Sequence, residues 1–324
     1  MNLAFRQRWL PTLVTAAVLL LLLAAAGALY PGFLRPLVFA NILRNNAYLG
    51  ILALGMTFVI LSGGIDLSVG TLLAFSTILL ARAIEAGLHP LPAAFAVAAV
   101  GTFFGAGQGL LIHSFRLPPF LVTLAGMFLA KGLAFAVSLQ SLTISHPHFD
   151  AAASFRILVP GRAPLTTATW MFLVLLAAGI LLARRTRFGR NVYALGGSED
   201  TALLMGLPIA RTRVTVYALS GLCAALAGLA MTLNTRSGNP AIGLGMELDA
   251  IACAVIGGTL LTGGVGSVFG TFLGVLIFGS IKTALDFHGG LDSSWLRIAM
   301  GILLLAFIVL QRALSRSGSP NPNS

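Results

Sequence analysis

The sequence has very little charge. Aspartate, glutamate, lysine and arginine together make up only 9% of its 324 residues, whereas a soluble globular domain carries roughly 25%. Hydrophobic residues account for 57% of the chain, so there are too few polar side chains to cover a folded chain of this size. These proportions exclude a soluble globular domain and predict a protein whose solvent is lipid.

Other scarce or missing features exclude several function classes. The two cysteines, Cys223 and Cys253, lie in apolar runs, which excludes a disulfide framework and a CxxC redox or zinc site. No GxSxG or HExxH motif is present, and neither Lys131 nor Lys282 follows the glycine spacing of a Walker loop. We therefore expect no enzyme activity and no cofactor, and ATP, if it drives the protein, must be used by a separate chain.

Long apolar runs are what the sequence has in abundance. Leu10 to Leu29 is a charge-free stretch of 20 residues, which at about 1.5 Å per residue matches the roughly 30 Å hydrocarbon core of a bilayer. Nine further candidate spans follow: Asn46 to Leu61, Val69 to Ile84, Leu91 to His113, Pro119 to Leu139, Leu165 to Ala183, Val214 to Leu233, Leu248 to Leu261, Val265 to Leu285 and Ser294 to Leu310. The predicted fold class is all-α, a polytopic membrane helical bundle of about ten transmembrane helices. The second, third and eighth spans are short for a straight crossing, which predicts broken or partly re-entrant helices.

The distribution of arginine predicts the orientation. The net charge is +11, but the arginines fall in short polar gaps and form no single basic face, which argues against a nucleic-acid partner. Residues 184–213 hold six arginines, and positively charged loops stay in the cytoplasm. With ten spans, this loop and both termini share the cytoplasmic side of the inner membrane. The predicted organisation is a transmembrane domain over residues 1–314 and a disordered cytoplasmic tail over 315–324.

Two hairpins resemble each other at an offset of 200 residues. Ser62 to Leu73 aligns without a gap with Thr262 to Leu273, and each segment contains a glycine pair, Gly63-Gly64 and Gly263-Gly264. Such a match predicts an internal parallel repeat, because six predicted spans separate the two copies. The alternative is that a glycine pair is simply a tight turn. Asp66 has no counterpart, since Gly266 stands at the matching position.

One short helix is predicted inside the arginine-rich loop. Ser198 can cap a helix whose first turn carries Glu199 and Asp200, which favour the positive end of the helix dipole. An apolar face of Leu203, Leu204 and Met205 follows, and Gly206 ends the helix. A helix this short is unstable alone, so it must dock, either in a groove of a partner or against its own bundle or the lipid interface.

Polar residues within apolar runs are candidates for a translocation pathway. The candidates are Asn45, Asn46, Ser62, Gly63, Gly64, Asp66, Gln108, Lys131, Gly263 and Gly264. Amides could bind sugar hydroxyls or could join helices to one another, and Asp66 could equally be a helix cap. Lys131 could line the pathway or extend toward the interface. Glu247 and Asp249 could cap a helix or contact a binding protein.

A metal site is not expected. His146, His148 and Asp150 have a spacing that a metal could use, but no fourth ligand is in view in this loop.

Several motifs together resemble a known family. Gly55 to Gly70 (GMTFVILSGGIDLSVG), Thr186 to Arg190 with Tyr193 to Gly197, and Glu247 to Ala252 with Val255 to Thr259 are similar to the permease subunits of ribose-type sugar ABC importers. The resemblance covers Asn41 to Gln311, and Ile144 to Pro147 and Leu291 to Trp295 resemble the galactofuranose branch.

The resemblance implies a set of partners and a mechanism. It implies a second permease, identical or paralogous, ATP-binding cassette subunits below, a periplasmic sugar-binding protein above, and a coupling region that includes Gly196 and Gly197 and runs to Gly206. Alternating access would move the sugar. The competing interpretation is an ion-coupled secondary transporter or channel, for which several buried carboxylates are expected.

Overall fold

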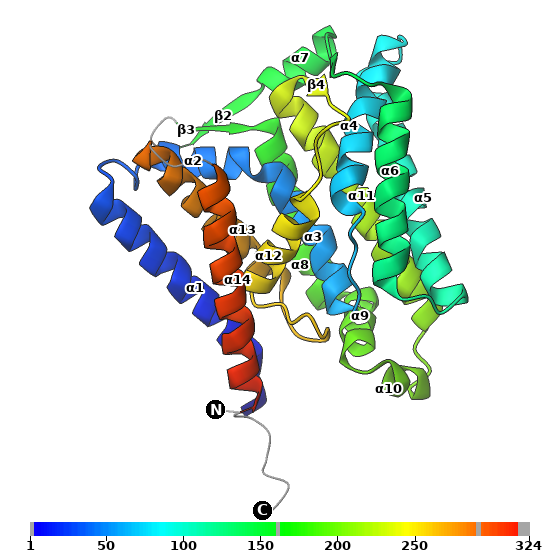
Figure 1. Cartoon of the computed structure of the whole chain (residues 1–324), viewed down its shortest axis with the longest axis vertical. Helices are drawn as coiled ribbons and strands as arrows, with labels where there is room; N and C mark the ends of the chain where they lie inside the picture. The colour runs from blue at the N-terminus through cyan, green and yellow to red at the C-terminus, as the bar shows by residue number, and fades with distance from the viewer. Residues whose placement is uncertain (1–2, 160–162, 290–292, 317–324) are drawn as a thin grey trace, which may run out of the picture.

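The computed structural model describes residues 3–159, 163–289 and 293–316, and in them it shows a helical assembly with two small antiparallel sheets at its edge (Figure 1). The helices are α1 (Leu3–Leu29), α2 (Pro36–Asn45), α3 (Ala47–Leu61), α4 (Val69–Glu85), α5 (Pro90–Ser114), α6 (Pro119–Val137), α7 (Pro147–Ser154), α8 (Thr167–Arg185), α9 (Arg187–Gly197), α10 (Glu199–Leu204), α11 (Ile209–Thr235), α12 (Met246–Ile256), α13 (Val268–His288) and α14 (Ser293–Arg316). The strands are β1 (Leu142–Thr143), β2 (Arg156–Val159), β3 (Ala163–Thr166) and β4 (Ser237–Gly238), paired β1 with β4 and β2 with β3. The predicted all-helical class is confirmed.

Fewer helices qualify as membrane crossings by length and composition than the sequence suggested. Six helices in the described part of the chain are long and apolar enough to cross a bilayer, and α2 with α3, bent by 58° at Asn46, makes up to seven. Helices α4, with 17 residues, and α12, with 11, are too short to qualify, and the described stretch of α14 that was found apolar, Ser294–Val309, is shorter than a candidate span. The expected ten spans are therefore not confirmed.

The centre of the molecule is built from helices that are apolar on every side. In α3 every residue except Tyr48 is buried, as expected of a helix without a polar face. Helix α11 packs along α5, α3 and α4, and α12 packs between α3 and α13. Short helices can lie at the centre of the bundle because the longer helices around them shield their exposed backbone ends from lipid.

Different elements lie at the two ends of the bundle. Helices α9 and α10 lie at the lower end of Figure 1, together with the start of α1 and the end of α14, whereas α7 and the two sheets lie at the upper end. The arginine-rich loop and the two terminal helices thus share one end, as expected from the sequence, while the side of the membrane on which this end lies stays a prediction. Helix α14 includes the first two residues of the predicted tail, and residues 317–324 lie outside the described part.

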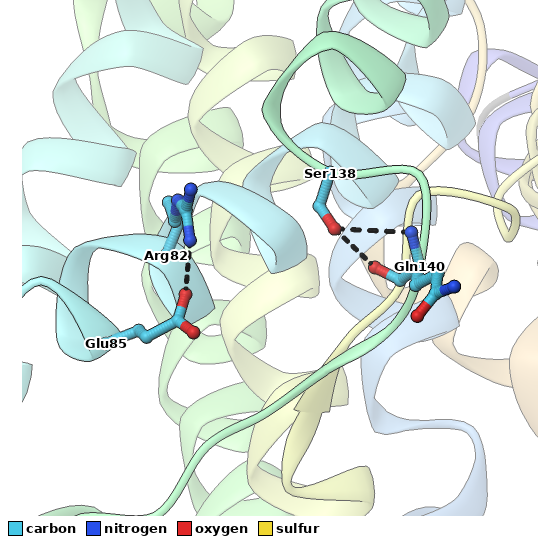
Figure 2. Close-up of polar contacts among 4 residues, drawn as sticks. All are labelled: Arg82, Glu85, Ser138 and Gln140. Carbon is cyan, nitrogen blue, oxygen red and sulfur yellow. Dashed lines mark hydrogen bonds and ion pairs between the residues drawn. The ribbon is translucent and has the colours of Figure 1, made fainter.

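Exposed polar contacts close two helices at the upper end. Arg82 forms an ion pair with Glu85 in the last turn of α4, with a nitrogen–oxygen distance of 2.7 Å. Beyond α6, the Ser138 hydroxyl donates to the Gln140 carbonyl and accepts from the Gln140 amide (Figure 2). An exposed ion pair contributes only about 0.2–1 kcal/mol to the stability of the fold. These contacts therefore stabilise the helix ends locally and do not hold the bundle together.

The second hairpin departs from the predicted repeat. Helix α3 ends at Leu61 and is followed by Gly63 with a φ of +83°, but α12 ends at Ile256, and the glycine that follows it with a positive φ is Gly258, at +92°. Gly263-Gly264 therefore lies in a loop after α12 and is not the turn that ends the helix. The two aligned glycine pairs therefore stand at different distances from the helices that precede them, and the parallel repeat is not confirmed.

Candidate functional site

Helix α10 presents an apolar face to the outside. Ser198 is its N-cap and its hydroxyl accepts a hydrogen bond from the Thr201 amide, as predicted. Leu203, Leu204 and Met205 are 65%, 88% and 69% exposed, and Gly206 follows with a φ of +70°. The bundle does not cover this face, so the interpretation in which it packs on its own chain is wrong for these three side chains.

Two contacts hold α10 against the bundle. Ala202 is buried in a small apolar cluster with Leu195 of α9 and Ile209 of α11. Glu199 forms an ion pair with Arg213, whose side chain is only 17% exposed. Together these contacts fix α10 to α9 and α11, so it projects from the bundle in one position.

The cap on α10 gives a first prediction. Ser198→Ala removes the acceptor for the Thr201 amide, and loss of such a cap costs about 1 kcal/mol. We expect a small loss of thermal stability in detergent and increased proteolysis confined to residues 198–206. A matched change, Ser141→Ala at the opposite end, should leave that cleavage unchanged. Equal cleavage of the wild type and Ser198→Ala would contradict the assigned cap.

Three glycine pairs meet above α10, and we call them the glycine junction: Gly63-Gly64, Gly196-Gly197 and Gly263-Gly264. The Gly264 amide donates to the Leu61 carbonyl at 3.0 Å. A Cβ atom on Gly196 would overlap the Leu61 carbonyl oxygen and lie 2.6 Å from the Gly264 nitrogen. The end of α9 therefore touches both loops backbone to backbone, which only residues without a side chain permit.

Asp66 lies beyond the junction as seen from α10, in the connection between α3 and α4. It is 1% exposed. Its Oδ1 accepts from the Ser68 amide at 2.9 Å and lies 2.6 Å from the Ser68 hydroxyl, and its Oδ2 accepts from the Ser220 hydroxyl at 2.7 Å. Burial raises the pKa of the Asp66 carboxyl, while the hydrogen bonds from Ser68 and Ser220 act in the opposite direction. Asp66 thus joins α4 to α11 and is not simply a cap.

Gln108 belongs to the same polar group. Its Oε1 lies 3.3 Å from the Ser68 hydroxyl, while its Nε2 is buried without a partner. Lys131 lies apart from it: Nζ donates to the carbonyls of Pro240 and Ile242 and sits 5.0 Å from the centre of the Phe135 ring. The lysine therefore ties α6 to the segment before α12.

The predicted asparagines separate at the bend between α2 and α3. Asn46 is buried, with Nδ2 donating to the Ile42 carbonyl at 2.8 Å and Oδ1 unpartnered. Asn45 is exposed, and its Oδ1 accepts from Arg44. Ser62 bonds back to the Val59 carbonyl. The sequence predicted all three as pathway residues, but only Asn46 and Ser62 lie at the interior or beside the junction.

The acidic pair of α12 corrects one expectation. Glu247 is only 7% exposed, and its Oε1 accepts from the Gly245 amide at the start of the helix. It acts as a cap and is not placed for contact with a soluble binding protein. Asp249 is partly exposed, and its contact stays a prediction.

The histidines of the upper end form a ring cluster. His146 and His148 pack with His89, with ring centres 4.8–5.5 Å apart, and Asp150 forms an ion pair with Arg236. Among the residues that the structure describes, no group of three His, Cys, Asp or Glu is placed to hold a metal ion.

Sequence reasoning missed a polar stripe on α11. Arg213, Tyr217 and Ser220 follow one another at helical spacing in an otherwise apolar helix. Arg213 pairs with Glu199 and Ser220 with Asp66, so the stripe runs from α10 to the polar group around Asp66. The spacing of these residues at i, i+4 and i+7 was the available signal, because it marks one helix face.

Comparison with known proteins supplies the family. Residues 38–308 match the model of a family described as branched-chain amino acid transport system / permease component. The chain belongs to this permease family. It is 48% identical to the inner membrane ABC transporter permease protein YjfF of Escherichia coli over 95% of this chain and 94% of that protein. It is 37% identical to the fructose import permease FruG of Bifidobacterium longum, with 96% and 93% covered, and 38% identical to the ribose import permease RbsC of Bacillus subtilis, with 92% and 91% covered.

Membership fixes the general role of the molecule. The chain is a multi-pass inner-membrane protein of a bacterial ABC permease family, and its relatives are permease components of importers. No solved structure matches it.

Proposed function

We propose that this chain is the permease of an ATP-driven importer that carries a monosaccharide, galactofuranose in particular, across the inner membrane by alternating access. Its relatives are named for the import of fructose and ribose and the transport of xylose, which supports a monosaccharide. The proposed partners are a separate ATPase subunit, a second permease that is identical or paralogous, and a periplasmic sugar-binding protein. Both termini and α10 lie in the cytoplasm in this proposal.

The exposed face of α10 carries the proposal. A helix of six residues is too short to be stable in water by itself, yet here it is capped, anchored by Ala202 and directed outward with three large apolar side chains. Such a face fits a groove in a partner better than it fits water. An ATPase that closes on nucleotide would grip this face and move α9 and the glycine junction with it.

The hydrogen bonds of Asp66 give little support to the alternative of an ion-coupled transporter. A proton or sodium relay needs carboxylates that can change partners. Asp66, the acidic residue of the central hairpin, has both oxygens engaged by Ser68 and Ser220. This arrangement favours a structural role for Asp66 and a source of energy outside the chain.

A charge on the α10 face tests the coupling. We expect Leu204→Asp to insert and fold normally, because this side chain is 88% exposed. Its copurification with the ATPase subunit should fall at least tenfold and sugar uptake should fall to background, since an aspartate would be desolvated in the groove. The control is Leu139→Asp, an 80% exposed leucine at the upper end, which should assemble normally. Normal ATPase assembly of Leu204→Asp would refute the proposed role of α10.

The cargo is tested in cells. Cells that lack this chain and then regain it should recover uptake of labelled galactofuranose, and a panel with ribose, fructose and xylose sets the specificity. Unchanged uptake of every sugar in the deletion strain would refute the assignment to sugar import.

A further inference from the structure

The turn between α8 and α9 gathers three exposed arginines. Arg185 is the last residue of α8, and Arg187 and Arg190 lie within the first four residues of α9. Residues three positions apart are neighbours on the surface of a helix, so Arg187 and Arg190 share one side of α9. The side chains of all three arginines are exposed. They form one positively charged surface, which we call the α9 arginine patch.

The backbone of this turn is held rigidly. The Thr186 hydroxyl donates to the Leu182 carbonyl at 2.6 Å and accepts from the Gly189 amide at 3.1 Å. A Cβ atom on the buried Gly189 would overlap the Ala183 carbonyl oxygen, so the start of α9 rests directly on the last turn of α8. Phe188 packs against an aromatic ring of α3, with ring centres 6.0 Å apart. The apolar side of α9 is therefore fixed inward, and the arginine patch faces outward.

No carboxylate in the part of the chain that the structure describes pairs with the patch. The ion pairs formed there involve other arginines. Glu199 and Asp200 lie beyond the far end of α9, which with 11 residues is about 16 Å long, and Glu199 is paired with Arg213. The three positive charges of the patch are therefore available to an anion from outside the chain.

The patch lies at the depth of the lipid headgroups. Helix α8 is long and apolar enough to cross the membrane, and its 19 residues reach about 28 Å, close to the roughly 30 Å hydrocarbon core. Its last residue is therefore at the boundary of the hydrocarbon, at the lower end of the bundle (Figure 1). Val174 and Leu181, 62% and 60% exposed, share one face of α8 with Arg185. An apolar face that ends in arginines matches a phospholipid, whereas free phosphate would leave the apolar face uncovered.

We propose that the α9 arginine patch binds the headgroup of an anionic phospholipid whose chains lie along α8. Guanidinium groups bind phosphate oxygens through charged, often paired, hydrogen bonds, and basic clusters next to a transmembrane helix attract anionic lipids. The far end of α9 is Gly196-Gly197 in the glycine junction. A lipid at the start of α9 would thus hold one end of the helix whose other end contacts the junction, so transport should depend on anionic lipid. This last consequence rests on the proposed function.

Neutralisation of two arginines tests the lipid site. The purified full chain in detergent is titrated with dioleoyl phosphatidylglycerol or dioleoyl phosphatidylcholine, and bound lipid is counted by native mass spectrometry. We expect wild type to prefer phosphatidylglycerol, and Arg187→Gln with Arg190→Gln to bind it at least tenfold more weakly, because each arginine near a membrane surface adds to the attraction of anionic lipid. An excess of inorganic phosphate should not displace the lipid from wild type.

A second pair of arginines is the matched control. Arg116→Gln with Arg211→Gln removes the same charge from exposed positions near α10 but outside the patch, and should bind phosphatidylglycerol like wild type. Glutamine is a good helix former, so both double variants should unfold at the wild-type temperature in detergent without added lipid.

Four outcomes overturn the lipid site: equal binding of the two lipids by wild type, equal phosphatidylglycerol binding by wild type and Arg187→Gln with Arg190→Gln, equal weakening in the two double variants, or displacement by phosphate. A patch that serves only the ATPase subunit would give the second outcome together with lost copurification. Because lipid is counted on the purified chain, these failures leave sugar uptake by cells intact. Absence of uptake with the wild-type chain overturns the proposed function alone.

Discussion

Gly196→Ala is expected to destabilise the protein by about 3 kcal/mol and to abolish sugar uptake. The new Cβ would overlap the Leu61 carbonyl oxygen and crowd the Gly264 amide. Overpacking costs about 1–3 kcal/mol, and more where the neighbours cannot move. Here the neighbours are backbone atoms of Leu61, at the end of α3, and of Gly264, which are hydrogen-bonded to each other. The end of α9 must then separate from both loops, so movement of α10 no longer reaches them.

The neighbouring glycine is a matched control for this change. No atom lies within 4 Å of a Cβ built on Gly197, and alanine within a helix is favoured over glycine by up to about 1 kcal/mol. Thermal unfolding in detergent and uptake in cells should therefore separate Gly196→Ala from Gly197→Ala. Equal stability and equal uptake of the two variants would show that the glycine junction has no mechanical role.

The second large effect is expected at Asp66. Asp66→Ala removes the acceptor for the Ser68 amide, the Ser68 hydroxyl and the Ser220 hydroxyl. All three donors are buried, and unmatched buried donors cost about 1–3 kcal/mol each. Since Ser68 keeps Gln108 as a neighbour, we expect a net loss of about 3–5 kcal/mol and little assembled protein in the membrane.

An isosteric change separates hydrogen bonding from the rest of the aspartate. In Asp66→Asn the amide oxygen can still accept from Ser68, and the amide nitrogen can donate to the Ser220 oxygen. About half of the stability lost in Asp66→Ala should therefore be retained, as measured by thermal unfolding of the two purified variants. If both variants were as stable as wild type, the contact between α4 and α11 through Asp66 would not hold the fold together.

Local features of the site were predictable from the sequence. The cap at Ser198, the acidic first turn and the outward Leu203, Leu204 and Met205 depend on neighbours within a few positions, so the residue types alone reveal them. The turn after α3 followed equally from Gly63. Hydropathy identified the long spans because their length must match the bilayer.

Features that join distant segments were not predictable in the same way. Asp66 and Ser220 are 154 positions apart, and the glycine junction unites the end of α9 with two loops that no local pattern relates to it. The ten spans are not confirmed because α4 and α12 are too short to qualify by length, and it is burial by neighbouring helices that keeps these short helices inside the molecule. The end of α12 was misplaced, because Gly257-Gly258 and Gly263-Gly264 read alike in one dimension.

The two short central helices do not span the bilayer by themselves. Helix α3, with 15 residues, and α12, with 11, reach only about 22 and 16 Å at 1.5 Å per residue, against the roughly 30 Å of surrounding oil. Neither helix is long enough to line a path across the whole bilayer, so the loops that follow them, which contain Gly63-Gly64 and Gly263-Gly264, extend the protein on the side of α9. A displacement of α9 therefore reaches the two short helices directly through these loops.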